Sequence, residues 1–238
     1  MKIKISSFLF LGLFFSCCSK NEPAPPADGP PKWVNPLAGL PDEGRIRWDA
    51  LKIGQRSRYL YFEANGQGHP AQVNPTYHQD TLVLAITGQD AQGFILTEFI
   101  IPDSAGRFVS DTAYLKVNHL KIEQDSLQYI QSQPFNSNIF VDKTRSLLLT
   151  PFAPPIPEYS EAIPVFSAKT EKWSAFTQQH SHLGHTYGPL NLVFDYRDMV
   201  ADGWGYMFAY HAPNGLVRFT WVSWWSTDLA KGWDLLEE

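Results

Sequence analysis

Apolar and polar residues alternate with a period of two over most of the chain from Arg45 onward, which is typical of β-strands with one buried face. In the clearest example, Leu82, Leu84 and Ile86 fall on one side of an extended segment. The segment 94–101 has the same character. The link at 88–93, Gly-Gln-Asp-Ala-Gln-Gly, is rich in turn formers, so the sequence predicts a hairpin here.

Short links join the other strands that the pattern predicts. Two further hairpins are predicted, one of 114–122 with 126–131 and one within 138–149. The C-terminal block contains strands at 189–197, 206–212 and 216–225. We therefore expect an all-β fold, in which an antiparallel meander of about nine or ten strands forms a curled barrel or, as the second choice, a two-sheet sandwich. A curled barrel is similar to that of the lipocalins. Their Gly-x-Trp signature is absent, however, since Ile46 and Arg47 precede Trp48.

Two segments depart from the strand pattern. Residues 169–180 are the best helix candidate, because Trp173 and Phe176 are three positions apart and would share one helical face. One helical turn is also expected at Ser226–Gly232. Strands and helices do not alternate regularly along the chain, which excludes a parallel α/β sheet.

The N-terminal stretch differs from everything that follows. Two lysines precede an uncharged apolar run at 5–15, and the small residue Ser16 then stands before Cys17 and Cys18. The apolar run has the length of a signal-peptide core and is too short for a stable transmembrane helix. This order of residues resembles the signal of bacterial lipoproteins. The resemblance implies cleavage before Cys17, or alternatively before Cys18, and acylation of the new N-terminal residue.

The same resemblance implies a location and a membrane partner. We expect a lipid-anchored protein of the bacterial cell envelope, at the outer membrane. The periplasmic face and the surface face of that membrane are both kept as alternatives. An ordinary secretory signal is the alternative, although no A-x-A-like cleavage site stands nearby. The expected organisation is a signal peptide at 1–16, a proline-rich tether at 17–44 and a single β-rich domain at 45–238.

Charge and cysteine content narrow the function classes. The formal net charge is −5, and cleavage of the leader removes Lys2 and Lys4, which gives −5 − 2 = −7. We expect no nucleic-acid partner, because an acidic chain without a basic cluster binds phosphate backbones poorly. Both cysteines of the chain stand in the leader region, so the domain must be held together by its core rather than by disulfides.

Three histidines form the sharpest local cluster of candidate ligands. His180, His182 and His185 occur within six residues, and neutral imidazoles are good ligands for zinc or copper. In an extended segment His180 and His182 would share a face. The sequence thus offers a candidate metal site, with a solvated polar loop as the alternative interpretation. The motifs of nucleotide- and phosphate-binding loops are absent, and no cofactor is predicted.

Aromatic side chains of the C-terminal block are the candidate ligand-binding surface. Trp204, Tyr206, Trp224 and Trp225 offer flat faces on which sugars or apolar ligands stack, although aromatic residues also fill cores. The function expected is therefore non-catalytic binding of a small apolar or sugar ligand, a glycan or an envelope protein. Two alternatives stay open, a metal-dependent hydrolase that uses the His180–His185 region and a structural subunit of an envelope assembly.

Overall fold

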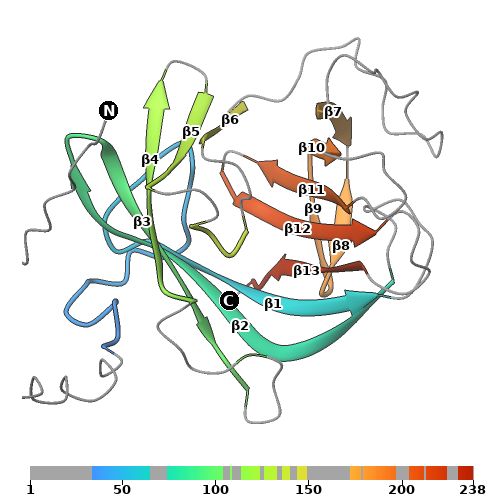
Figure 1. The fold of residues 1–238 in the computed structure, drawn as a ribbon, viewed down its shortest axis with the longest axis horizontal. Coiled ribbons are helices and arrows are strands. Elements are labelled where there is room, and N and C mark those ends of the chain that lie inside the picture. Colours follow the sequence, from blue (N-terminus) through green and yellow to red (C-terminus); the bar gives the residue numbers. More distant parts are fainter. Residues whose placement is uncertain are drawn as a thin grey trace, which may run out of the picture. The chain divides into compact units, whose positions relative to one another are not determined.

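The described part of the chain contains thirteen strands, and the computed structural model pairs them into one large sheet and a small ribbon (Figure 1). The strands are β1 (Arg56–Ala64), β2 (Pro75–Asp90), β3 (Gly93–Ile101), β4 (Lys116–Glu123), β5 (Ser126–Gln131), β6 (Thr144–Leu148), β7 (Lys172–Thr177), β8 (His180–His182), β9 (His185–Tyr187), β10 (Leu190–Tyr196), β11 (Trp204–His211), β12 (Gly215–Ser223) and β13 (Ala230–Leu235).

The structure describes residues 34–64, 74–103, 108, 114–123, 126–132, 136–139, 144–148, 172–177, 179–196, 204–211, 213–223 and 230–237. All of them belong to one unit, Trp33–Glu238. The proposed signal peptide, Cys17, Cys18, Trp224 and Trp225 lie outside the described residues. In the described part of the chain, no helix has the length and apolar character needed to cross a bilayer.

The large sheet has eleven strands in the order β6-β5-β4-β3-β2-β1-β13-β12-β11-β10-β7, and every neighbouring pair is antiparallel. Figure 1 shows this sheet curled into a half-barrel, with β1 beside β13. The all-β, antiparallel fold and the choice of a curled sheet are confirmed. The strands slightly outnumber the expected nine or ten.

The hairpin of β2 and β3 forms where the alternating pattern predicts it. Asp90 pairs with Gly93, and the Asp90 carboxylate accepts a hydrogen bond from the backbone N–H of Gln92 at 2.8 Å, which closes the turn. Gly93 has a φ of +134°, and a Cβ at this position would lie 2.5 Å from the carbonyl oxygen of Leu120. Only glycine therefore lets β4 approach the turn closely.

The expectation of two helical segments is wrong at the residues of each that the structure describes. Lys172–Thr177 forms strand β7, whose Trp173 and Phe176 pair with Phe194 and Asn191 of β10. Pairing with a neighbouring strand thus outweighs a short helical spacing of two aromatic residues. Likewise the end of the predicted C-terminal turn is already strand β13, which starts at Ala230.

One continuous apolar core joins the sheet to the segment that precedes β1. Ile46, Trp48 and Leu51 are buried in the same cluster as Tyr59 and Trp233. Trp48 packs against Tyr210 with ring centroids 5.5 Å apart, and a Cβ at Gly215 would lie 3.0 Å from the indole Nε1 of Trp48. The segment 45–55 is therefore fixed against the start of β12, and this contact positions the polar residues around it.

Candidate anion-binding groove

The segment 45–58 carries five basic residues and one acidic residue, Asp49, in a chain whose net charge is −5. Two pockets open beside this segment, with volumes of about 430 Å³ and about 240 Å³. The larger is lined by Glu43, Arg45, Arg47, Ala50, Lys52, Gln55, Pro213 and Asn214. The smaller is lined by Asp42, Gly44, Arg45, Arg56, Ser57, Arg58, Leu236 and Glu237. Because both include Arg45, we name them together the Arg45 groove.

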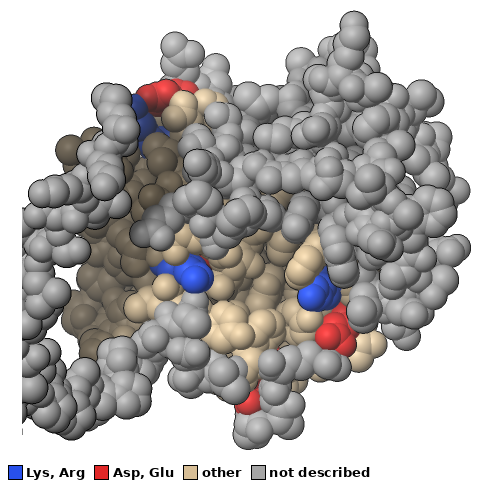
Figure 2. All heavy atoms as spheres, in the orientation of Figure 1, with Lys and Arg blue, Asp and Glu red and all other residues tan. Residues whose placement is uncertain are grey.

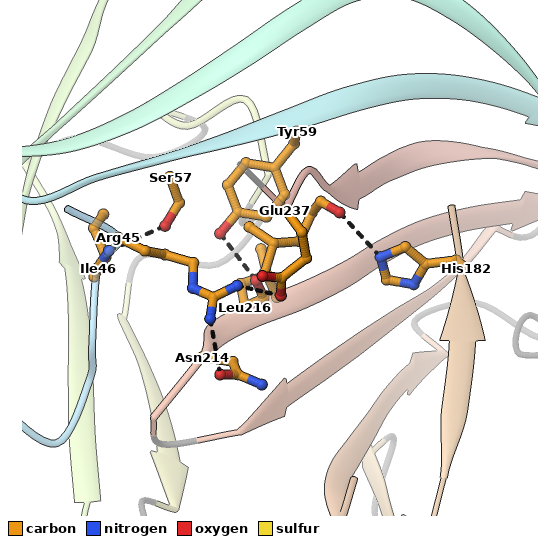
Figure 3. A network of polar contacts seen from close by, with 9 residues as sticks. Arg45, Ile46, Ser57, Tyr59, His182, Asn214, Leu216 and Glu237 are labelled. Carbon is orange, nitrogen blue, oxygen red and sulfur yellow. Dashed lines mark hydrogen bonds and ion pairs between the residues drawn. The ribbon is translucent and has the colours of Figure 1, made fainter. Parts of the chain in front are cut away.

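Arg45 is held at the junction of the two pockets by partners from distant parts of the chain (Figure 3). Its guanidinium forms an ion pair with Glu237, just beyond β13, and donates a hydrogen bond of 3.3 Å to the side-chain oxygen of Asn214, just before β12. The Arg45 side chain is still 32 % exposed. A guanidinium has five N–H donors, so these contacts leave donors of Arg45 available to a ligand.

The other basic side chains of the groove differ in how they are paired. Arg56 contacts Asp42 at 2.8 Å, and Arg47 contacts Asp49 at 3.0 Å. Among the residues that the structure describes, Lys52 has no carboxylate within ion-pair distance. Counting the lining residues, the groove has five positive and three negative side chains, a balance of 5 − 3 = +2. It is a positively charged site on an acidic protein.

Buried hydrogen bonds lie beside the groove, and Figure 3 shows two of them near Arg45. The backbone N–H of Ile46 donates to the Ser57 hydroxyl at 3.2 Å, and the Tyr59 hydroxyl donates to the carbonyl of Leu216 at 2.9 Å. Burial raises the pKa of Tyr59 well above its usual range. A further bond, from the backbone N–H of Lys52 to the Gln55 side chain at 2.9 Å, fixes the loop before β1. The cationic side chains therefore extend from a rigid base.

The three histidines of the candidate metal site lie on the ribbon of β8 and β9. His182 is buried, its Nε2 lies 3.2 Å from the carbonyl oxygen of Leu235, and its ring stacks on Tyr187 with centroids 4.8 Å apart. His180 shares the face of His182, as expected, with ring centroids 5.3 Å apart. Burial lowers the pKa of His180 to about 3, which keeps its imidazole neutral. His185 is exposed.

Among the described residues these histidines gain no further metal ligand, and the candidate metal site stays a prediction. In the described ranges, no group of three or more His, Cys, Asp and Glu side chains is placed to hold a metal ion. His182 contacts Leu235, the last residue of β13, and Glu237 follows two residues later. The ribbon thus packs beside the Arg45 groove (Figure 3).

Two of the four aromatic candidates lie in the described sheet. Trp204 and Tyr206 belong to β11, where Tyr206 pairs with Trp221 of β12. Their backbones are placed, but their side chains, like all of Trp224 and Trp225, lie outside the described part of the structure. The aromatic surface therefore stays a prediction.

The Arg45 groove is the site that sequence reasoning missed. The expectation of an acidic chain without a basic cluster is wrong for 45–58, which holds five of the 19 lysines and arginines. A local count of charge would have found this signal. That Asn214 and Glu237 contact Arg45 could not be predicted from the sequence, because only the folded sheet brings them together.

A scan against protein-family models gave no match, and searches of curated proteins and of solved structures gave none either. The function is therefore argued from the site itself.

Proposed function

We propose that this chain is a lipid-anchored protein of the bacterial envelope whose β-domain binds a small ligand with an anionic group in the Arg45 groove. The observation that carries the proposal is the convergence of five basic side chains on two pockets that share Arg45. The polar lining favours a phosphate or carboxylate, including that of an acidic sugar, over the purely apolar ligand that the aromatic residues suggest. A volume of about 430 Å³ suits a small metabolite or a headgroup.

Arginine is well suited to this task because its planar guanidinium donates two parallel hydrogen bonds to a carboxylate or phosphate. A ligand anion would compete with Glu237 for Arg45 and would meet the ammonium of Lys52, which has no carboxylate within ion-pair distance among the described residues. Recognition would therefore replace the Glu237 carboxylate by the anionic group of the ligand at Arg45 and add a new ion pair at Lys52. Such binding depends on charge and weakens as the salt concentration rises.

The Arg45→Gln variant is expected to bind glycerol phosphate and gluconate at least tenfold more weakly than the unchanged protein. The variant loses a charge-assisted hydrogen bond, which is worth about 1.5–3 kcal/mol. Isothermal titration calorimetry measures the change, with glycerol and glucose as uncharged counterparts. Lys121→Gln is the control, because Lys121 lies on β4, is exposed and lines neither pocket. Equal binding of glycerol and glycerol phosphate would refute the proposal.

The anchor is tested separately from the groove. Metabolic labelling with palmitate is expected to mark the unchanged protein and to be lost in Cys17→Ser, because the acylated residue itself is removed. If Cys18 is the acceptor instead, Cys18→Ser loses the label and Cys17→Ser keeps it. A protein that remains unlabelled and is found in the cytosol with its leader attached contradicts the proposal of an anchor.

A further inference from the structure

We infer that the anion taken up by the Arg45 groove is the phosphate of a lipid headgroup, so that the tethered β-domain docks with this end on an anionic membrane surface. The inference rests on the proposed function, since it names the source of the anion that the groove binds. It goes beyond that function because it orients the whole domain relative to the membrane. Three observations support it.

The first is the order of the chain. The groove begins at Asp42, and Arg45 follows the proposed acylation site Cys17 by 45 − 17 = 28 residues. These basic side chains are therefore among the first parts of the fold that the tether reaches. A short tether makes docking an intramolecular event at an effective concentration on the order of millimolar. Even a weak affinity for headgroups is then sufficient.

The second is the exposure of apolar side chains within the same stretch of chain. Val34 is 71 % exposed and Ile53, which follows directly on Lys52, is 41 % exposed. An exposed aliphatic side chain beside a lysine suits the interface of a membrane, where the apolar group enters the headgroup region and the cation meets phosphate. The same pairing occurs on β4, at Lys116 with Val117 and at Lys121 with Ile122, so the two pockets are what distinguish the groove.

The third is the contrast between the groove and the rest of the molecule. Figure 2 shows one face of the molecule, on which few of the described residues are charged. The whole chain has a net charge of −5, whereas the groove has a balance of +2 from its lining residues. An anionic surface therefore repels the chain as a whole and attracts this end of it. Anionic headgroups fit this charge pattern, and a neutral membrane does not.

The inference is tested with the acylated protein in lipid nanodiscs made of phosphatidylcholine alone or with added phosphatidylglycerol. Hydrogen–deuterium exchange is measured for peptides that cover 34–58. We expect slower exchange of this stretch only in the anionic discs, and the protection should disappear at high salt. Lys52→Gln combined with Arg58→Gln removes one cation from each pocket and should lower the ratio of docked to free domain about 25-fold, at about fivefold per charge.

The control is Lys116→Gln combined with Lys121→Gln, which changes the net charge equally on β4, outside both pockets. This variant should keep the protection. Equal exchange in both kinds of disc, or equal loss in both double variants, overturns the inference. If glycerol phosphate still binds in solution, the proposed function survives that result. Should the protein be recovered without acyl chains, the same two lipid mixtures are used as vesicles, and failure to sediment with the anionic ones overturns the inference.

Discussion

Replacing Asp234 with alanine is expected to lower the free energy of unfolding by about 3–5 kcal/mol, because it leaves a buried arginine without its counter-charge. Arg218 and Asp234 are neighbours across β12 and β13 and are 2 % and 0 % exposed. The guanidinium donates to both carboxylate oxygens at 2.5 Å, and the Tyr77 hydroxyl donates to the same carboxylate at 2.6 Å. The cost comes mainly from the charge of Arg218, which stays buried and loses its carboxylate partner in the variant.

Urea denaturation of the purified chain measures this cost. Tyr77→Phe is the matched control, since it removes one hydrogen bond to Asp234, leaves the ion pair intact and should cost about 1 kcal/mol. Arg218→Met combined with Asp234→Leu should recover most of the loss, because a hydrophobic pair of similar volume avoids the desolvation penalty. A cost below that of Tyr77→Phe for the single variant would mean that the pair contributes little.

The alternating pattern predicts the fold well where a strand has one buried side. Leu82, Leu84 and Ile86 are all buried in the core, and the turn that follows lies at Asp90 and Gly93. The pattern predicts a helix where the structure has strand β7, because pairing with β10 determines the conformation there. It also fails at the third predicted hairpin, where Ile139 is buried but does not belong to a strand. A residue can be apolar because it fills the core from a loop.

The candidate site could be predicted only in part, for a related reason. The charge density of 45–58 is visible in the sequence, and it marks the basic half of the groove. The acidic half is not visible, because Glu237 meets Arg45 across 192 residues of chain. The same holds for Arg218 and Asp234, whose contact depends on the register of β12 and β13. Contacts set by register require the folded sheet.

A second buried charge holds a loop against the sheet. Glu98 of β3 is fully buried and accepts hydrogen bonds from the Tyr129 hydroxyl at 2.8 Å and from the Asn118 side chain at 3.2 Å. From the loop, the Ser137 hydroxyl donates at 2.9 Å and the backbone N–H of Asn138 at 2.7 Å. One carboxylate thus joins three strands to the segment 136–139.

Glu98→Ala is expected to cost about 3–5 kcal/mol, because it leaves these four donors without their acceptor in a buried site. Glu98→Gln keeps the shape and one acceptor oxygen and should cost less. The free energy of unfolding of each variant checks this order. Hydrogen exchange of Asn138 gives a local readout, since its amide should lose protection in Glu98→Ala. If the two variants are equally stable, the donors are satisfied by water and the loop does not depend on Glu98.

The raised pKa of Glu98 determines in which direction the free energy of unfolding changes with pH. Burial raises the pKa of Glu98 above its ordinary value of 4.5, although the four donors oppose the shift. Between the two pKa values the folded state binds more protons than the unfolded state, so stability falls as the pH rises and levels off above the folded pKa. Unfolding free energies measured from pH 4 upward should thus fall for the unchanged protein relative to Glu98→Gln, by at most about 1.4 kcal/mol per pH unit. The other carboxyl groups are common to both proteins and cancel in the difference. A difference that rises with pH would mean that the hydrogen bonds from Tyr129, Ser137 and the loop outweigh burial.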